Sequence, residues 1–358
     1  MSARSLPIQT SLPTLRTPIC FLRHPPTRQR VPSQLWTSGR KRWMQDVLVK
    51  AAVKSVDEAG AEVDTLLAVD SAESESSVVA LLRSLAEEGV LLGFDGASQV
   101  PKRDYSLAEL KLNNVDTTKL LAPEENTITS TRTALQVALT AGIVSLVVAG
   151  GVNVNEALGF VVVLLFFAGA DQIVYRGGIE FLLLDSLTRL LRPSYGQKVA
   201  WHEAGHFLIA YFVGLLPKDY TLSAMDAIKR YRAFTVQAGT VFCDREFQQE
   251  VGSGKLKSTS VDRVTCVAVA GVVAEYLKFG FAEGGLNDLG QLDQLMRSLQ
   301  FSQKKVDSQI RWSVINVATL LRRHAKTHEA LAAEMSNGAS VGSCIKLIES
   351  QLQTAEFV

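Results

Sequence analysis

The chain has 358 residues, of which 47% are hydrophobic and 20% charged, a balance typical of a protein with a sizeable core and some membrane-buried length. The formal net charge of +1 gives no support to a nucleic-acid-binding function. The four cysteines, Cys20, Cys243, Cys266 and Cys344, lie far apart and form no CxxC pair. Their spacing therefore predicts neither a disulfide framework nor a cysteine zinc site. Such cysteine usage favours a reducing compartment.

Residues 1–45 contain no Asp or Glu but seven arginines and one lysine, among many Ser, Thr and Pro. No apolar core of a secretory signal is present, so this segment is typical of an organellar transit peptide, with a disordered basic tail as the alternative. The Ser, Thr and Pro content and the weak amphipathicity favour the chloroplast over the mitochondrion.

Residues 46–130 are predicted to form a small helical region of unknown role. Helical periodicity extends over residues 44–92, interrupted by an acidic, serine-rich loop at 70–77. Residues 93–131 resemble a connector with one short helix at 106–112.

Residues 134–174 predict a two-helix transmembrane hairpin. The segment 134–152 is almost entirely apolar, a polar break follows at 153–156, and 157–174 is again apolar if Asp171 and Gln172 lie at the interface. The second span is short, so a re-entrant segment or a buried core helix is an alternative. Positive charge on both flanks places both ends on one side, the matrix or stroma. The flanking residues are Arg132, Arg176, Arg189 and Arg192.

Residues 194–355 predict an α-rich domain with a small β element, so the expected fold class is mainly α, with two transmembrane helices before this domain. Helices are expected at 194–214, 259–280, 287–299, 306–335 and 341–352, with a strand at 234–243. Thr259 with Asp262 resembles a capping box, and Asn287 is a candidate N-cap.

The most informative motif is His202-Glu203-Ala204-Gly205-His206, an HExxH pattern on a predicted helix. Residues four apart lie on one helix face, so both imidazoles can bind a single Zn²⁺ while Glu203 acts as the catalytic base. Five histidines in the whole chain make a chance match improbable, on the order of one in a hundred. Gly205 weakens the helix, which indicates close approach of another element.

A zinc site of this kind needs a third protein ligand. The third histidine of an extended HExxHxxGxxH motif is absent, since residue 212 is Phe, and the remaining candidates are the carboxylates Glu275, Asp288 and Asp293. His24 lies in the predicted transit peptide. His324 and His328 have basic neighbours and are expected to form a surface face.

The HEAGH motif, the segment Val-Ala-Glu-Tyr-Leu-Lys-Phe-Gly at 273–280 and the segment Gly-Gly-Leu-Asn-Asp-Leu at 284–289 together resemble the peptidase domain of the FtsH family of membrane zinc proteases. The resemblance covers residues 196–352. It implies that Asp288 is the third zinc ligand and that Glu275 orients the site from outside the ligand set. It also implies that residues 238–243 form an edge strand beside the site, with an ordinary core strand as the alternative.

The family's ATPase module is missing, because only about twenty-five residues separate 174 from 199, and residues 252–255 do not complete a P-loop. We therefore expect a membrane-anchored zinc metalloendopeptidase that cleaves loose segments of organellar proteins. The expected location is a chloroplast membrane, thylakoid or inner envelope, with the peptidase domain facing the stroma.

The expected partners are protein or peptide substrates and membrane lipid, not nucleic acid, with a homo-oligomer or a separate ATPase as possible further partners. The alternatives are a non-catalytic assembly factor that keeps the fold, and an intramembrane zinc protease. The latter is disfavoured because the apolar run after His206 is too short to span a membrane.

Overall fold

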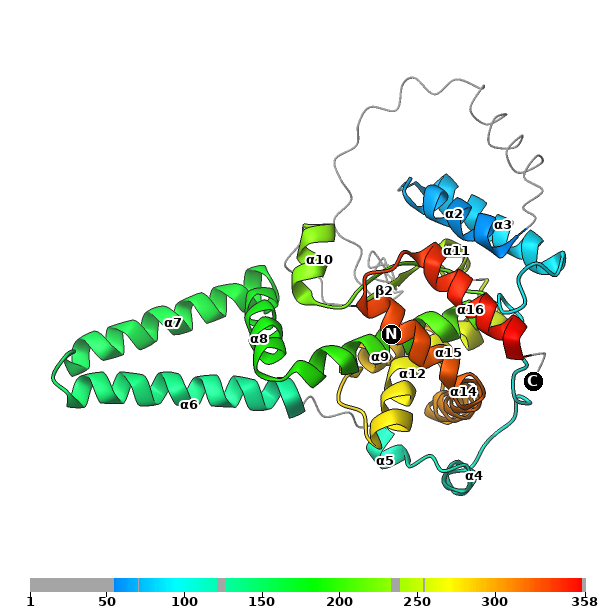
Figure 1. Ribbon diagram of the computed structural model, residues 1–358. Helices are drawn as coiled ribbons and strands as arrows, with labels where there is room; N and C mark the ends of the chain where they lie inside the picture. Colours follow the sequence, from blue (N-terminus) through cyan, green and yellow to red (C-terminus); the bar gives the residue numbers. More distant parts are fainter. Residues whose placement is uncertain (1–54, 70, 121–125, 233–238, 254, 356–358) are drawn as a thin grey trace, which may run out of the picture.

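The computed structural model describes residues 55–69, 71–120, 126–232, 239–253 and 255–355. The predicted transit peptide at 1–45 lies outside these residues. The described chain is mainly α-helical with one two-stranded sheet, and a helical hairpin projects from a compact body (Figure 1).

The centre of the body is helix α9 (Pro193–Phe212), which is buried from His202 to Phe212. It packs against α12 (Ser258–Phe279) and α15 (Ala325–Ser336), and α14 (Gln303–Arg323) covers the other side of α12. A Cβ atom on Gly205 would lie 2.7 Å from Cβ of Ala274 on α12. Gly205 therefore permits the close approach of α9 and α12, which its position in the motif indicated.

The N-terminal helices α2 (Val56–Leu67) and α3 (Ala72–Glu87) belong to the same hydrophobic core as α9. Helix α2 packs on α16 (Val341–Ala355), and α3 packs on α2. The fully buried carboxylate of Glu349 on α16 accepts hydrogen bonds from the backbone N–H groups of Leu92 and Gly93 and from the hydroxyl of Tyr211. The described residues between 55 and 120 thus pack along the body, with α4 (Leu107–Leu112) and α5 (Thr117–Leu120) at its lower edge in Figure 1.

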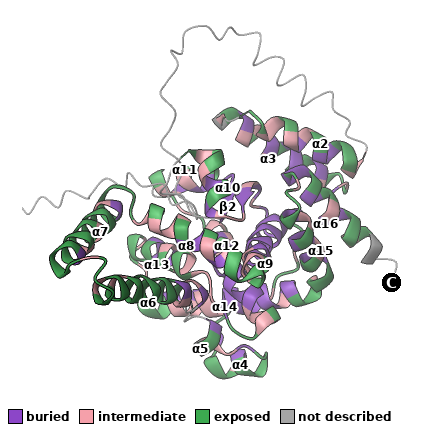
Figure 2. Cartoon of the chain, turned by 60° about the vertical axis from the view of Figure 1, so that its left-hand side comes forward, coloured by how far each residue is buried: buried purple, intermediate pink, exposed green. Residues whose placement is uncertain are grey.

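The hairpin consists of α6 (Asn126–Val148) and α7 (Val154–Val174), and both helices are exposed along most of their length (Figure 2). The two candidate membrane spans, Thr127–Val148 and Val154–Val174, each have only 6% of their apolar window buried. The second span is therefore not a buried core helix. Its 21 residues extend over about 30 Å, the thickness of a bilayer's hydrocarbon core.

The hairpin leads into α8 (Gly178–Leu191), which runs across its foot between hairpin and body (Figure 1). Both carboxylate oxygens of Asp171 accept hydrogen bonds from backbone N–H groups at the start of α8, those of Ile179 and Glu180. Arg132 on α6 pairs with Glu180 at 2.8 Å. The corner between hairpin and body is thus fixed by polar contacts.

Strand β1 (Pro217–Thr221) pairs antiparallel with β2 (Gly239–Phe242), with Tyr220 opposite Thr240. The surrounding helices are α10 (Ala224–Tyr231), α11 (Arg245–Ser253) and α13 (Leu286–Ser298). β2 falls within the predicted strand at 234–243, of which residues 234–238 are outside the described residues. β1, α8, α10 and α11 were not predicted from the sequence.

Several sequence predictions about helix ends are wrong. Residues 72–77 belong to α3, whose N-cap is Ser71, and are not a loop. The N-cap of α12 is Lys257, and Asp262 instead accepts hydrogen bonds from Lys102 and Gln309. The N-cap of α13 is Gly285, not Asn287. The predicted helix at 306–335 is two helices that meet at His324.

Candidate metal centre

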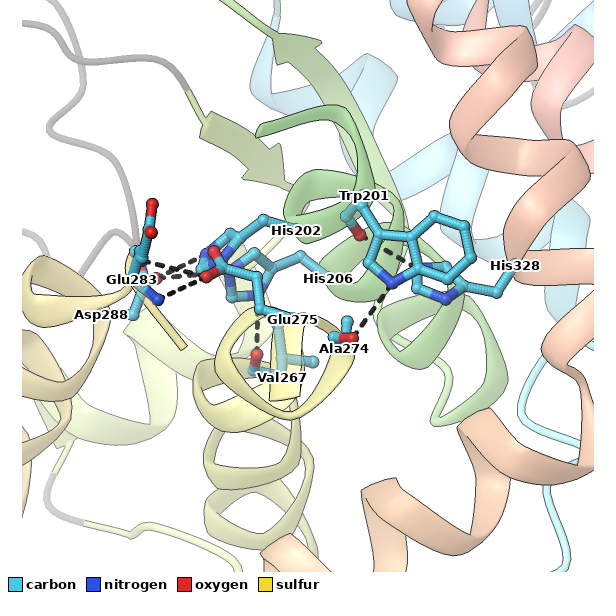
Figure 3. A network of polar contacts seen from close by, with 10 residues as sticks. Trp201, His202, His206, Val267, Ala274, Glu275, Glu283, Asp288 and His328 are labelled. Atoms are coloured by element: carbon cyan, nitrogen blue, oxygen red, sulfur yellow. Dashed lines mark hydrogen bonds and ion pairs between the residues drawn. The ribbon is translucent and has the colours of Figure 1, made fainter. Parts of the chain in front are cut away.

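Helix α9 presents His202 and His206 on one face, and the first turn of α13 brings Asp288 to them (Figure 3). The Nε2 atoms of the two histidines lie 3.0 Å apart. Oδ2 of Asp288 lies 3.1 Å from Nε2 of His202 and 3.3 Å from Nε2 of His206. Three atoms that can bind a metal ion therefore form a nearly equilateral triangle.

In each histidine, a hydrogen bond from Nδ1 orients the ring so that Nε2 faces this triangle. Nδ1 of His202 donates to the carboxylate of Glu275 at 2.6 Å, and Nδ1 of His206 donates to the carbonyl of Val267 at 2.8 Å. In the neutral rings both Nε2 atoms then carry lone pairs directed at each other and at a carboxylate oxygen. Such an arrangement is repulsive unless a proton or a metal cation lies among the three atoms.

The electrostatics of the cluster also favour a cation. Burial opposes charge on His202, but the hydrogen bonds that its ring donates to Asp288 and Glu275 outweigh burial and raise the pKa of His202 well above 6.5. Burial likewise opposes charge on Asp288, yet His206 and His202 lower the pKa of this carboxyl. The group of His202, His206 and Asp288 can hold a metal ion.

The triangle matches the dimensions of a zinc site. Ligand atoms at about 2.0–2.1 Å from a tetrahedral zinc ion lie ~3.4 Å from one another. The observed separations of 3.0, 3.1 and 3.3 Å approach this value. Two imidazoles, one carboxylate and an open position make up the donor set of a catalytic zinc site, which the residues present here fit.

Glycines surround the His202 ring where larger residues would collide with it. A Cβ atom on Gly271 of α12 would lie 2.2 Å from Nε2 of His202. Gly285, with φ +89°, supplies the left-handed backbone that starts α13, and a Cβ atom there would lie 2.2 Å from Val272. The close packing of α12 and the loop before α13 holds the ring in one position.

Glu275 connects His202 to that loop. One carboxylate oxygen accepts from His202, and the other accepts from the backbone N–H groups of Glu283 at 2.6 Å and Gly284 at 3.1 Å (Figure 3). Glu275 is thus buried with both oxygens hydrogen-bonded, and it orients His202 without joining the ligand triangle.

Glu203 is buried beside the triangle, and Oε2 accepts a hydrogen bond from the hydroxyl of Thr240 on β2 at 2.8 Å. Burial raises the pKa of Glu203, while the nearby histidines lower it to a smaller extent. A carboxylate with a raised pKa accepts a proton more readily, as a general base requires.

A cleft of about 130 Å³ opens onto these groups. Its polar lining includes Glu203, Thr240 and the three candidate ligands, and its apolar lining includes Phe242 of β2. Two further walls come from the foot of the hairpin and from α8. These walls contain Thr127, Ile128 and Phe181.

The other predicted candidates lie elsewhere. Asp293 pairs with Arg297 at 2.8 Å on the exposed side of α13. The prediction that His324 and His328 form a surface face is wrong for His328, which is buried against Trp201 on the far side of α9 (Figure 3). The basic neighbours of His328 did not predict its position, because its ring points inward while the side chains of Arg323 and Lys326 are exposed.

Sequence reasoning missed Thr240, Glu283 and the glycines around His202. The only available signal was the unusual density of glycine near Asp288, at 280, 284 and 285. Comparison of the chain with protein-family models, with curated proteins and with solved structures finds no match. The resemblance of the motifs to the FtsH peptidases therefore stays a prediction.

Proposed function

We propose that this protein is a membrane-anchored zinc metalloendopeptidase. The observation that supports the proposal most strongly is the convergence of His202, His206 and Asp288 within 3.3 Å, with the carboxylate of Glu203 in the same cleft. A purely structural metal site needs no buried carboxylate beside its ligands, and such sites use four protein ligands and have no open position.

A zinc ion held by these residues would supply Lewis acidity, polarising the substrate carbonyl and acidifying a water molecule in the cleft. Glu203 takes a proton from this water as its oxygen adds to the carbonyl carbon. The proton passes to the amide nitrogen as the C–N bond breaks, so that water is divided between the two products. The Thr240 hydroxyl orients Glu203, and Glu275 keeps Nδ1 of His202 protonated.

Strand β2 is suited to hold a peptide in extended form. Among the residues that the structure describes, β1 is its only strand partner, and Gly239, Thr240 and Phe242 face the cleft. A substrate that pairs with the other edge of β2 would lie across the candidate metal position. Main-chain hydrogen bonds would then supply affinity with little dependence on sequence.

The two exposed apolar helices of the hairpin support anchoring in a bilayer, with the body on one side. A chloroplast location, stromal orientation and action on loose segments of organellar proteins are the expectations from the sequence that accompany this proposal. A partner ATPase or a homo-oligomer is compatible with it.

The proposal is tested by Glu203→Gln in the full-length chain, purified in detergent with zinc. We expect the zinc content to stay at the wild-type level while hydrolysis of an unstructured peptide falls ~10²–10⁴-fold, because only the base is lost. Glu329→Gln is the matched control, since Glu329 pairs with Lys278 at the surface. Equal activity of Glu203→Gln and wild type would exclude Glu203 as the base. A zinc-loaded wild type that cleaves nothing would favour the assembly factor.

A further inference from the structure

The foot of the hairpin is part of the wall of the candidate active site. Thr127 and Ile128, in the first turn of α6, line the cleft together with Phe181 of α8. The candidate membrane span begins at Thr127, and its continuous apolar stretch begins about two turns later in the same helix, at residue 134. The cleft and the candidate membrane span therefore share residues, with no intervening domain.

Polar contacts join this foot to the support of the candidate metal site. The hydroxyl of Thr127 donates to Glu283 at 2.5 Å, and Lys198 of α9 pairs with the other Glu283 oxygen at 2.9 Å. The backbone N–H of Glu283 in turn donates to Glu275, the partner of His202. A short chain of hydrogen bonds thus fixes the distance between the hairpin and the candidate metal ligands.

Helix α8 forms the second wall of the cleft, through Phe181. Its inward face contains the buried residues Leu184, Asp185 and Thr188, and Asp185 accepts a hydrogen bond from the backbone of Ala224. Its outward face exposes large apolar side chains. These are Ile179, Leu183, Leu190 and Leu191.

The outward face of α8 is continuous with the hairpin, which indicates that lipid covers this face. Asp171 caps α8 directly from the end of α7, and α8 runs transversely across the hairpin foot, where a bilayer surface would lie if the hairpin crosses it (Figure 1). A helix with one apolar and one polar face in this position is suited to the lipid headgroup region. The cleft lies against the same helix, through Phe181.

We infer that the substrates are juxtamembrane segments of other proteins in the same bilayer, which enter the cleft between the α6 foot, α8 and β2. This inference rests on the proposed function. One α-helix diameter, ~10 Å, separates the cleft from the lipid, and about three to four extended residues cover this distance. A segment that emerges from the bilayer reaches the site without being unfolded by a motor.

The test uses the full-length chain in phosphatidylcholine–phosphatidylglycerol vesicles. Two substrates carry the same cleavable sequence after one transmembrane helix, with a spacer of about five or of ~40 flexible residues. A third substrate is the same sequence as a soluble peptide. We expect the short-spacer substrate to be cleaved at least as fast as the long-spacer substrate, since both gain equally from confinement to the membrane.

The variant Leu183→Glu with Leu190→Glu separates the role of α8 from the chemistry. It should slow cleavage of the short-spacer substrate at least ~10-fold, and leave the soluble peptide unaffected. Leu112→Glu on α4 is the control, because Leu112 is 82% exposed, as Leu190 is 78% exposed. A fluorophore on Leu190→Cys should be quenched by brominated lipid, and one on Leu112→Cys should not, which reports lipid contact without any activity.

Cleavage of the long-spacer and soluble substrates but not of the short-spacer one would overturn the inference and leave the proposed function standing. Unquenched fluorescence at position 190 would also overturn it. If none of the three substrates is cleaved, both the proposed function and this inference are overturned.

Discussion

His202 and His206 each use Nδ1 for a hydrogen bond that fixes the ring, one to a carboxylate and one to a backbone carbonyl. The two bonds are unequal. Glu275 is an anion that strengthens its histidine as a ligand, while the Val267 carbonyl mainly sets orientation. The position of the candidate metal ion therefore depends on residues that never touch it.

Glu275→Gln should weaken zinc binding ~10–100-fold, because the anionic partner of His202 is lost while its shape is kept. Competition with a chromophoric chelator measures the dissociation constant. Asp293→Asn is the control, since Asp293 lies on α13 but pairs with Arg297 at the surface. Unchanged affinity in Glu275→Gln, or a loss of affinity in Asp293→Asn, would contradict the assignment of these two carboxylates.

Gly271→Ala should abolish stoichiometric zinc binding, because the new methyl group would lie 2.2 Å from Nε2 of His202 and push the ring out of the triangle. Zinc content after dialysis is the measurement. Gly290→Ala is the matched control, since no atom lies within 4 Å of its Cβ position and the substitution favours the helix by about 1 kcal/mol. Full zinc content in Gly271→Ala would show that the ring does not occupy this place.

Among the elements, α9 has contacts of different kinds on its two sides. One side faces the cleft, and the other packs against α15 through Trp201 and His328, whose rings lie 4.3 Å apart. Nε2 of His328 donates to the carbonyl of Trp201 at 2.9 Å. Burial lowers the pKa of His328 to about 4, so the ring is neutral at physiological pH.

This burial predicts a loss of stability in acid. Above pH 6.5 His328 is neutral in both states, whereas between pH 6.5 and about 4 the unfolded chain binds a proton that the folded chain does not. The free energy of unfolding should fall by about 2 kcal/mol between pH 7 and pH 5 from this group. His328→Gln should lose that much less than wild type over this range in urea unfolding followed by tryptophan fluorescence. Identical pH profiles would contradict the buried neutral ring.

At the scale of the whole molecule, short sequence patterns predicted the features that depend on neighbouring residues, namely the motif helix and the long apolar helices. The HExxH spacing identified the two candidate histidine ligands on α9, and hydrophobic runs identified both hairpin helices and the long helix α12. The cost of glycine in a helix also indicated that another element approaches closely at Gly205, and the structure shows that this element is α12.

Other features depend on contacts between distant segments and could not be predicted in this way. The predicted capping box of α12 does not form, because Lys102 and Gln309 of distant segments donate to the Asp262 carboxylate. Helix α8 begins after a three-residue break at 175–177, and its N-cap Gly177 has no capping side chain, because the start of the helix is held by Asp171 of α7 instead. The contact of residues 92 and 93 with the body depends on Glu349, which lies 256 residues from Gly93 in the chain.

The most direct test of this account is zinc X-ray absorption spectroscopy on the full-length chain, with metal content measured on the same sample. We predict about one zinc ion per chain, with only nitrogen and oxygen neighbours at about 2.0–2.1 Å and an imidazole scattering pattern that Asp288→Asn weakens or removes. A chain that binds no zinc would contradict the account, as would sulfur neighbours at ~2.3 Å.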